Sequence, residues 1–152
     1  MALTLKSSAF KHGEVIPSKY TCDGENISPL LEVHGVPEGT KSFTLVVDDP
    51  DATGGTTWDH WVMWNIHPKV QYISEGSIPE GAVLGKTGFG KAEYGGPCPP
   101  RGSDPHRYFF KIYALDTVLD LPEDTATKEE LEQAMQGHVL EETTLVGLYA
   151  RH

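Results

Sequence analysis

Two side chains with acid–base and hydrogen-bonding chemistry, His106 and Tyr108, lie where a stiff loop meets a strand-like run in "YGGPCPPRGSDPHRYFFKIYAL", residues 94–115. Proline fixes the backbone of such a loop and lowers the entropy lost on ordering it. Side chains alternate along a strand, so this His and this Tyr point to the same face. Phe110 and Ile112 continue that face into the expected core. We therefore expect the imidazole and the hydroxyl at the rim of a pocket.

A second group of polar residues lies in "DDPDATGGTTWDHW", residues 48–61, which holds four carboxylates and His60. A carboxylate beside an imidazole favours the protonated ring and holds it in place. Two protonated histidines around one point, with a carboxylate behind them and a tyrosine hydroxyl alongside, would bind a phosphate or a carboxylate. Either histidine could instead be structural, and the spacing leaves both interpretations open.

Two other kinds of chemistry use the same residue types. Two histidines and one carboxylate could hold Fe(II) or Zn²⁺, which would make the chain a metal-dependent enzyme. The sequence has no tight ligand pair such as H-x-D or H-x-x-x-H. Hydrolase chemistry would need an activated nucleophile, but Ser103 lies in "RGSDP", which is typical of a turn, and no G-x-S-x-G elbow occurs. We expect no catalytic residue, no metal site and no cofactor.

The elements that must position these residues are mostly strands. "SFTLVVDD" alternates, with Phe43, Leu45 and Val47 on one face. "WDHWVMWNI" is aromatic and β-branched enough for a central strand, while "LLEVHGVP" and "TLVGLYA" indicate an early and a last strand. One helix is indicated by the capping-box pattern of Thr127 and Glu130. The pattern predicts a mainly all-β fold, a sandwich of two antiparallel sheets with one or two short helices near the C-terminus.

Length and charge limit the function further. The chain has 152 residues and a net charge of −10, so we expect one domain over residues 1–152 and no nucleic-acid partner. We read no signal peptide and no apolar run long enough to span a bilayer, which predicts a cytoplasmic protein without membrane insertion. Cys22 and Cys98 are expected to be neighbouring thiols kept reduced, with a disulfide left open. Three tryptophans on one strand, Trp58, Trp61 and Trp64, fit either core packing or a homodimer face.

The two polar stretches, with "YTCDGENISPLLEV" before them, resemble the signature regions of the phosphatidylethanolamine-binding proteins, also called Raf kinase inhibitor proteins, in their bacterial and archaeal branch. The resemblance rests on "DPDA", "HW…N" and "GPCPP.G…HRY" in this order. It implies two antiparallel sheets with a small cavity for phosphate-like anions. Thr53 stands where the family's usual "DPDAP" has its last proline.

The resemblance also implies which residues bind the anion. Asp49, His60, His106 and Tyr108 match the polar positions of the family's cavity. The positions that line or shape that cavity are matched by Asp51, Trp58, Gly96, Pro99 and Pro100. We therefore expect a non-enzymatic protein that binds a small anion such as phosphate, a phosphomonoester or a carboxylate. The family further suggests regulation or inhibition of a kinase or a protease.

Overall fold

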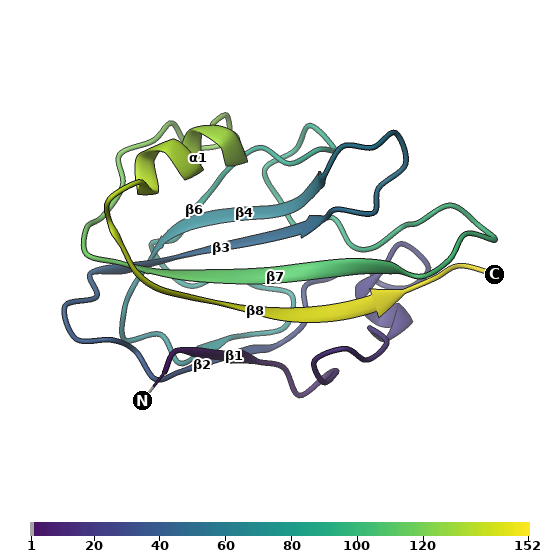
Figure 1. Ribbon diagram of the computed structural model, residues 1–152, viewed down its shortest axis with the longest axis horizontal. Coiled ribbons are helices and arrows are strands. Elements are labelled where there is room, and N and C mark those ends of the chain that lie inside the picture. Colours follow the sequence, from purple (N-terminus) through teal and green to yellow (C-terminus); the bar gives the residue numbers. More distant parts are fainter. Residues whose placement is uncertain (1) are drawn as a thin grey trace.

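Two antiparallel β-sheets make up most of the computed structural model, which describes residues 2–152 (Figure 1). The smaller sheet has the strand order β1-β2-β5, with β1 (Thr4–Lys6), β2 (Leu31–His34) and β5 (Tyr72–Ile73). The larger sheet has the order β6-β4-β3-β7-β8, with β6 (Val83–Leu84), β4 (Trp58–Ile66), β3 (Ser42–Asp49), β7 (His106–Leu115) and β8 (Val139–Tyr149). The predicted arrangement of two antiparallel sheets is confirmed.

The predicted helix is α1 (Lys128–Met135), and its start follows from the capping box. The Thr127 hydroxyl accepts from the N–H of Glu130, whose carboxylate accepts from the N–H of Thr127 at 3.1 Å. The sequence did not predict η1 (Ser18–Tyr20), a short 3₁₀ turn in the N-terminal part. Within residues 2–152, no helix has the length and apolarity needed to cross a membrane.

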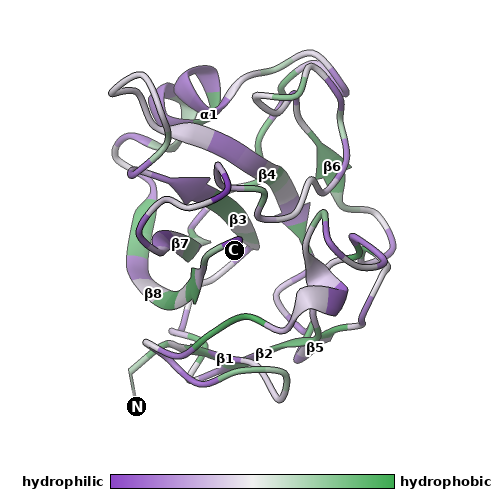
Figure 2. Cartoon of the chain, turned by 90° about the vertical axis from the view of Figure 1, so that its right-hand side faces the viewer, coloured by the Kyte–Doolittle hydropathy of each residue, from purple (hydrophilic) through white to green (hydrophobic). Residues whose placement is uncertain are grey.

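The five-stranded sheet is the middle layer of the molecule, with α1 on one face and the small sheet on the other (Figures 1 and 2). Strand alternation places Phe43, Leu45 and Val47 of β3 in the core between the sheets, while Val46 packs toward α1. The alternation predicted for this strand is confirmed. A sheet covered on both faces explains why all eight side chains of β3 are buried.

The three tryptophans of β4 divide between these layers. Trp61 is buried between the sheets and Trp64 is buried beneath α1. Trp58 alone is exposed, at 38%, at the start of the strand. The two buried tryptophans therefore serve core packing, so they form no aromatic face for self-association, and homodimerisation stays a prediction. Truncating either to alanine would cost about 3–5 kcal/mol of folding free energy.

The long segment between β6 and β7 is fixed to the N-terminal part of the chain by a disulfide between Cys22 and Cys98. The expectation that these cysteines are neighbours is confirmed, but the expectation of free thiols is wrong. Their Cα atoms lie 5.4 Å apart, within the range that a disulfide spans without backbone movement. The sequence shows only that both lie in turns, so it leaves both states open.

Candidate functional site

Three strand ends meet at one edge of the five-stranded sheet. Antiparallel pairing puts the end of β3 beside the starts of β4 and β7, since Asp49 is paired with Trp58 and Asp48 with Phe109. His60 lies two residues into β4, and His106 is the first residue of β7. The topology therefore brings the two polar stretches of the sequence together.

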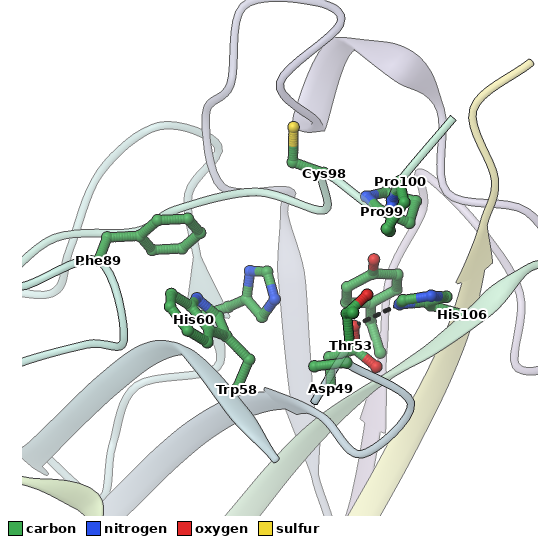
Figure 3. A pocket seen from close by; sticks show the side chains of 11 residues that line it. Asp49, Thr53, Trp58, His60, Phe89, Cys98, Pro99, Pro100 and His106 are labelled. Atoms are coloured by element: carbon green, nitrogen blue, oxygen red, sulfur yellow. Dashed lines mark hydrogen bonds and ion pairs between the residues drawn. The ribbon is translucent and has the colours of Figure 1, made fainter. Parts of the chain in front are cut away.

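A cavity of about 260 Å³ opens where these strands meet (Figure 3). Its polar groups come from the strand ends, and its walls are largely aromatic rings and prolines. The residues that line it are Asp49, Ala52, Thr53, Trp58, His60, Phe89, Cys98, Pro99, Pro100, His106 and Tyr108. No lysine or arginine is among these lining residues, so any positive charge inside the cavity must come from its histidines.

Asp49 orients the His106 ring. Nδ1–H of His106 donates to Oδ2 of Asp49 at 2.7 Å, and the N–H of Asp51 donates to Oδ1 at 2.8 Å. Asp49 is 3% exposed and His106 is 7% exposed, so this hydrogen bond is shielded from water. Because the Asp49 carboxylate can only accept, Nδ1 of His106 must be the donor. This leaves Nε2 as the nitrogen that can face a ligand. Figure 3 shows the pair on the side of the pocket opposite His60.

His60 presents its ring from the facing strand. Nδ1–H of His60 donates to the backbone carbonyl of Gly95 at 2.7 Å, which leaves Nε2 as the other nitrogen. The ring stands edge-on to Tyr108 and to Phe89, with centroid separations of 5.2 and 5.4 Å. Burial lowers the pKa of His60, although the Gly95 carbonyl and nearby carboxylates oppose the shift. The neutral form of the His60 ring is therefore favoured in the free protein. The expected state, with His60 and His106 both protonated, requires a bound anion that stabilises the protonated form of His60.

Tyr108 lies between the two histidines and is fully buried at its ring. It stacks on His106 with a centroid separation of 6.4 Å while meeting His60 at a steep angle. Burial, followed by the charge of Asp49, raises the pKa of the Tyr108 hydroxyl. The hydroxyl stays protonated at every physiological pH, so it can act as a hydrogen-bond donor.

Asp51, expected at the pocket, points elsewhere. Its carboxylate accepts from Nε and Nη2 of Arg107 at 2.9 Å each and from the Arg107 N–H at 2.9 Å. These hydrogen bonds lower the pKa of Asp51 to about 2. Asp51 is not among the residues that line the cavity. It instead clamps the loop after Asp49 onto β7 beside His106, which fixes the two halves of the site relative to each other.

The residues predicted to shape the wall divide in a similar way. Pro99 and Pro100 line the cavity. Gly96 lies behind it, where its N–H donates to Oδ1 of Asn26 at 2.8 Å. A Cβ at Gly96 would collide with the backbone carbonyl of Tyr20, so only glycine allows the wall to approach this closely. The segment that forms this pocket wall is therefore held in place by close packing and a hydrogen bond on the side that faces away from the cavity.

Phe89 lines the pocket but was not among the predicted binding residues, and the same holds for Ala52, Thr53 and Cys98. Phe89 lies edge-to-face with Trp58, with a centroid separation of 5.6 Å, and both rings border the cavity. A Cβ at Gly88 would come within 2.6 Å of the Trp58 ring, which explains one glycine of "KTGFGK". The available signal was an aromatic residue between two glycines in the long segment before β7.

A buried charge network lies on the opposite face of the sheet. Asp48 points away from the pocket, where its carboxylate meets Lys111 Nζ at 3.0 Å and Lys128 Nζ at 3.4 Å. Lys128 also meets Asp59 at 2.8 Å. Burial raises the pKa of Asp59, with Lys128 acting against it. This network anchors the start of α1 to the strand that carries Asp49.

The geometry does not favour the metal-site alternative. Among the residues described, 2–152, no three or more His, Cys, Asp or Glu side chains gather so that they could hold one metal ion. Asp49 already gives one carboxylate oxygen to His106 and the other to a backbone N–H. These contacts suit a carboxylate that positions an imidazole.

The family model described as phosphatidylethanolamine-binding protein matches residues 6–150. The chain belongs to this family. It is 52% identical to a "UPF0098 protein" of Methanothermobacter thermautotrophicus, in an alignment that covers 98% of this chain and 99% of that one. The predicted family resemblance is therefore confirmed.

Solved structures agree with this assignment. A phosphatidylethanolamine-binding protein homolog from Chlamydia trachomatis is 41% identical, with a TM-score of 0.93 and coverage of 99% of both chains. Escherichia coli YbcL, described as a member of the mammalian family, is 34% identical, with a TM-score of 0.94 and full coverage of both chains. A carboxypeptidase Y inhibitor in complex with its proteinase shares the fold alone, at 19% identity, a TM-score of 0.61 and coverage of 99% and 83%.

Proposed function

We propose that the chain binds small anions with a phosphate-like group in the pocket of His60, His106 and Tyr108, without catalysing a reaction. The observation that carries the proposal is the convergence of two imidazoles and one protonated hydroxyl on a cavity of about 260 Å³. Drug-sized ligands occupy pockets of roughly 300–1,000 Å³. The cavity therefore suits an inorganic anion or the headgroup of a larger molecule.

The charge balance of the pocket makes binding depend on protons. A protonated His106 and the carboxylate of Asp49 cancel each other's charge, so an anion gains a net positive site only when His60 is protonated as well. A bound anion favours that protonation because opposite charges attract, and the apolar walls strengthen the attraction. Anion binding therefore takes up a proton, and affinity rises as the pH falls.

Calorimetric titration with phosphate and with sulfate, at pH 6 and pH 8, tests this proposal. We expect tighter binding at pH 6, with proton uptake visible when buffers of different ionisation enthalpy are compared. Sulfate has no proton to gain in this range, so its pH dependence reports the protein alone. Free phosphoethanolamine and vesicles of phosphatidylethanolamine then distinguish a soluble phosphomonoester from a lipid headgroup.

The chain offers a matched control for the histidine variant. His138 donates from Nδ1 to the Asp116 carboxylate at 2.8 Å in an exposed pair outside the pocket. His106→Asn should abolish phosphate binding, whereas His138→Asn should leave it unchanged. Equal phosphate affinity in these two variants would disprove the proposal, as would the absence of any binding heat in the unmodified protein.

Regulation of a protease or a kinase is a further proposal, drawn from the family. A carboxypeptidase Y inhibitor shares the fold at low identity. The proline-rich segment before β7 is stiff, but Pro99 is buried and walls the pocket, so it is poorly placed to enter a protease cleft. We would expect a pocket-dependent effect, in which His106→Asn removes any inhibition measured. The cytoplasmic location likewise stays a prediction.

A further inference from the structure

We propose that the Cys22–Cys98 disulfide is a site of thiol–disulfide exchange that reacts with small thiols and dithiols, and that opening it weakens anion binding in the adjoining pocket. The exchange reaction rests on the exposure of Cys98 and the position of Arg151 beside its sulfur. Its effect on binding rests on the proposed function.

The disulfide lies at the wall between two hollows. Cys98 lines the anion pocket and also a neighbouring hollow of about 490 Å³, which Cys22 and Phe89 line as well. Figure 3 shows Cys98 at the rim of the pocket, near Pro99. Cys98 is exposed and Cys22 is partly exposed. Because Cys98 is exposed, we expect a thiolate in solution to reach its sulfur while the protein stays folded.

A cation accompanies this sulfur. Nη1 of Arg151 lies 3.6 Å from Sγ of Cys98, while Nε of the same guanidinium donates to Asp23 at 3.1 Å. Tyr149 donates to the other Asp23 oxygen at 2.6 Å, so the carboxylate holds the guanidinium in place. Thiol–disulfide exchange proceeds through thiolates, which a neighbouring arginine stabilises. Arg151 would attract an incoming anionic thiolate and stabilise a thiolate left on Cys98.

The reaction balances in two steps. The thiolate of a dithiol attacks Sγ of Cys98, the Cys22–Cys98 bond breaks, and Cys22 leaves as a thiolate that takes a proton from water. The second thiol of the reagent then attacks the mixed disulfide and releases Cys98 as a thiol. The protein gains two electrons and two protons, and the dithiol becomes a disulfide. A monothiol gives the mixed disulfide on Cys98 and a free Cys22 thiol, which either re-forms the original bond and releases the monothiol or is trapped by alkylation.

Near this bond, the pocket wall is tied to the rest of the chain by a few hydrogen bonds, among them one from Nη1 of Arg101 to the carbonyl of His152 at 3.0 Å. The Cys22 N–H donates to the carbonyl of Pro97 at 3.1 Å, and the Gly102 N–H donates to the carbonyl of Arg151 at 2.9 Å. Between these points, Pro99 and Pro100 have no N–H to donate. Opening a bond between residues 76 positions apart would free this stretch to move.

The first experiment measures exchange on the folded protein. An anionic thiol, 2-mercaptoethanesulfonate, should form a mixed disulfide on the Cys98 peptide, detected by mass spectrometry. Arg151→Gln should slow this reaction about fivefold, the effect of one charge at roughly 4 Å in water. Lys69→Gln, which removes one positive charge at an exposed turn after β4 and outside the pocket lining, should not slow it. A bond that reacts only after unfolding would overturn the exchange site, and equal rates in both variants would overturn the role of Arg151.

The second experiment measures phosphate affinity in the oxidised and the dithiothreitol-reduced protein. We expect at least about fivefold weaker binding after reduction, the lower range of coupling between two sites. The Cys22→Ser/Cys98→Ser double variant should match the reduced protein. If that variant does not fold, reduced protein with an unchanged near-ultraviolet circular dichroism spectrum gives the comparison. Equal affinities overturn the coupling and leave the proposed function standing, whereas no binding in either state overturns both.

Discussion

Tyr108→Phe removes one hydroxyl from the pocket and keeps the ring that packs between His60 and His106. Burial raises the pKa of this hydroxyl, so it is protonated at pH 6 and can donate to a bound anion. A net hydrogen bond to a charged group is worth about 1.5–3 kcal/mol. Phosphate binding at pH 6, measured by calorimetry, should therefore weaken by about 10- to 150-fold. Because the buried ring is retained, the free energy of unfolding should change by no more than about 1 kcal/mol.

Tyr113→Phe is the matched control for this variant. Tyr113 lies on the same strand but on the opposite face, packed toward α1, and burial raises the pKa of its hydroxyl to about 12. The two variants thus lose the same atom from the same strand, and only one of those atoms borders the pocket. Equal phosphate affinity in Tyr108→Phe and Tyr113→Phe would refute the assignment of Tyr108 as a ligand donor.

Three further predictions concern stability. Burial holds the pKa of His60 below its ordinary value of 6.5, so the unfolded chain binds this proton first and the stability of the ligand-free protein falls as the pH drops below about 6.5. In urea unfolding, His60→Gln should therefore lose less stability between pH 7 and pH 5 than the unmodified protein does. An identical loss of stability in both proteins would contradict the buried neutral ring. Asp51→Asn should lower the free energy of unfolding by only about 0.5–1 kcal/mol at pH 7, because its Arg107 partner is largely exposed. Since the pKa of the Asp51 carboxyl is about 2, this loss of stability should disappear between about pH 4 and pH 2. A loss that is constant with pH would rule out the ion pair as its cause. Lys128→Met should lower the free energy of unfolding by about 3 kcal/mol and the Tm by roughly 6–12 °C, because it leaves the Asp59 carboxylate buried without its partner. Lys41→Met, at an exposed position, is the control. A similar Tm for the two variants would show that the buried pair is not stabilising.

The layers of the fold were predictable because alternation is a local property. The apolar faces of β3 and β7 are visible in the sequence, and the capping box marks the start of α1. The order of strands in the sheets depends on pairings between distant residues, which a single sequence does not contain. The two-residue strand β6 lies in a glycine-rich segment, and η1 makes a single turn, so neither has a periodicity to detect.

The part of the site that was predictable is the part in which the alternation of side chains along a strand determines which face each side chain lies on. His106 and Tyr108 face the same way because they are two residues apart on β7, and Phe110 continues that face into the core. Asp51 was expected from the family resemblance to line or shape the pocket, yet its partner Arg107 lies 56 residues away, and only the folded chain shows that this pair forms. The disulfide was equally hidden, because turns carry free and paired cysteines alike.

We propose that His60 and His106 act together on one bound anion. Nitrogen-15 NMR of the imidazole rings during a phosphate titration at pH 7 tests it most directly. We predict that both rings shift with the same dissociation constant, and that His60 changes from a neutral ring with Nδ1–H to a protonated ring as phosphate binds. Unchanged signals from both rings at millimolar phosphate, or a bound phosphate that shifts other histidines instead, would rule out joint binding by His60 and His106.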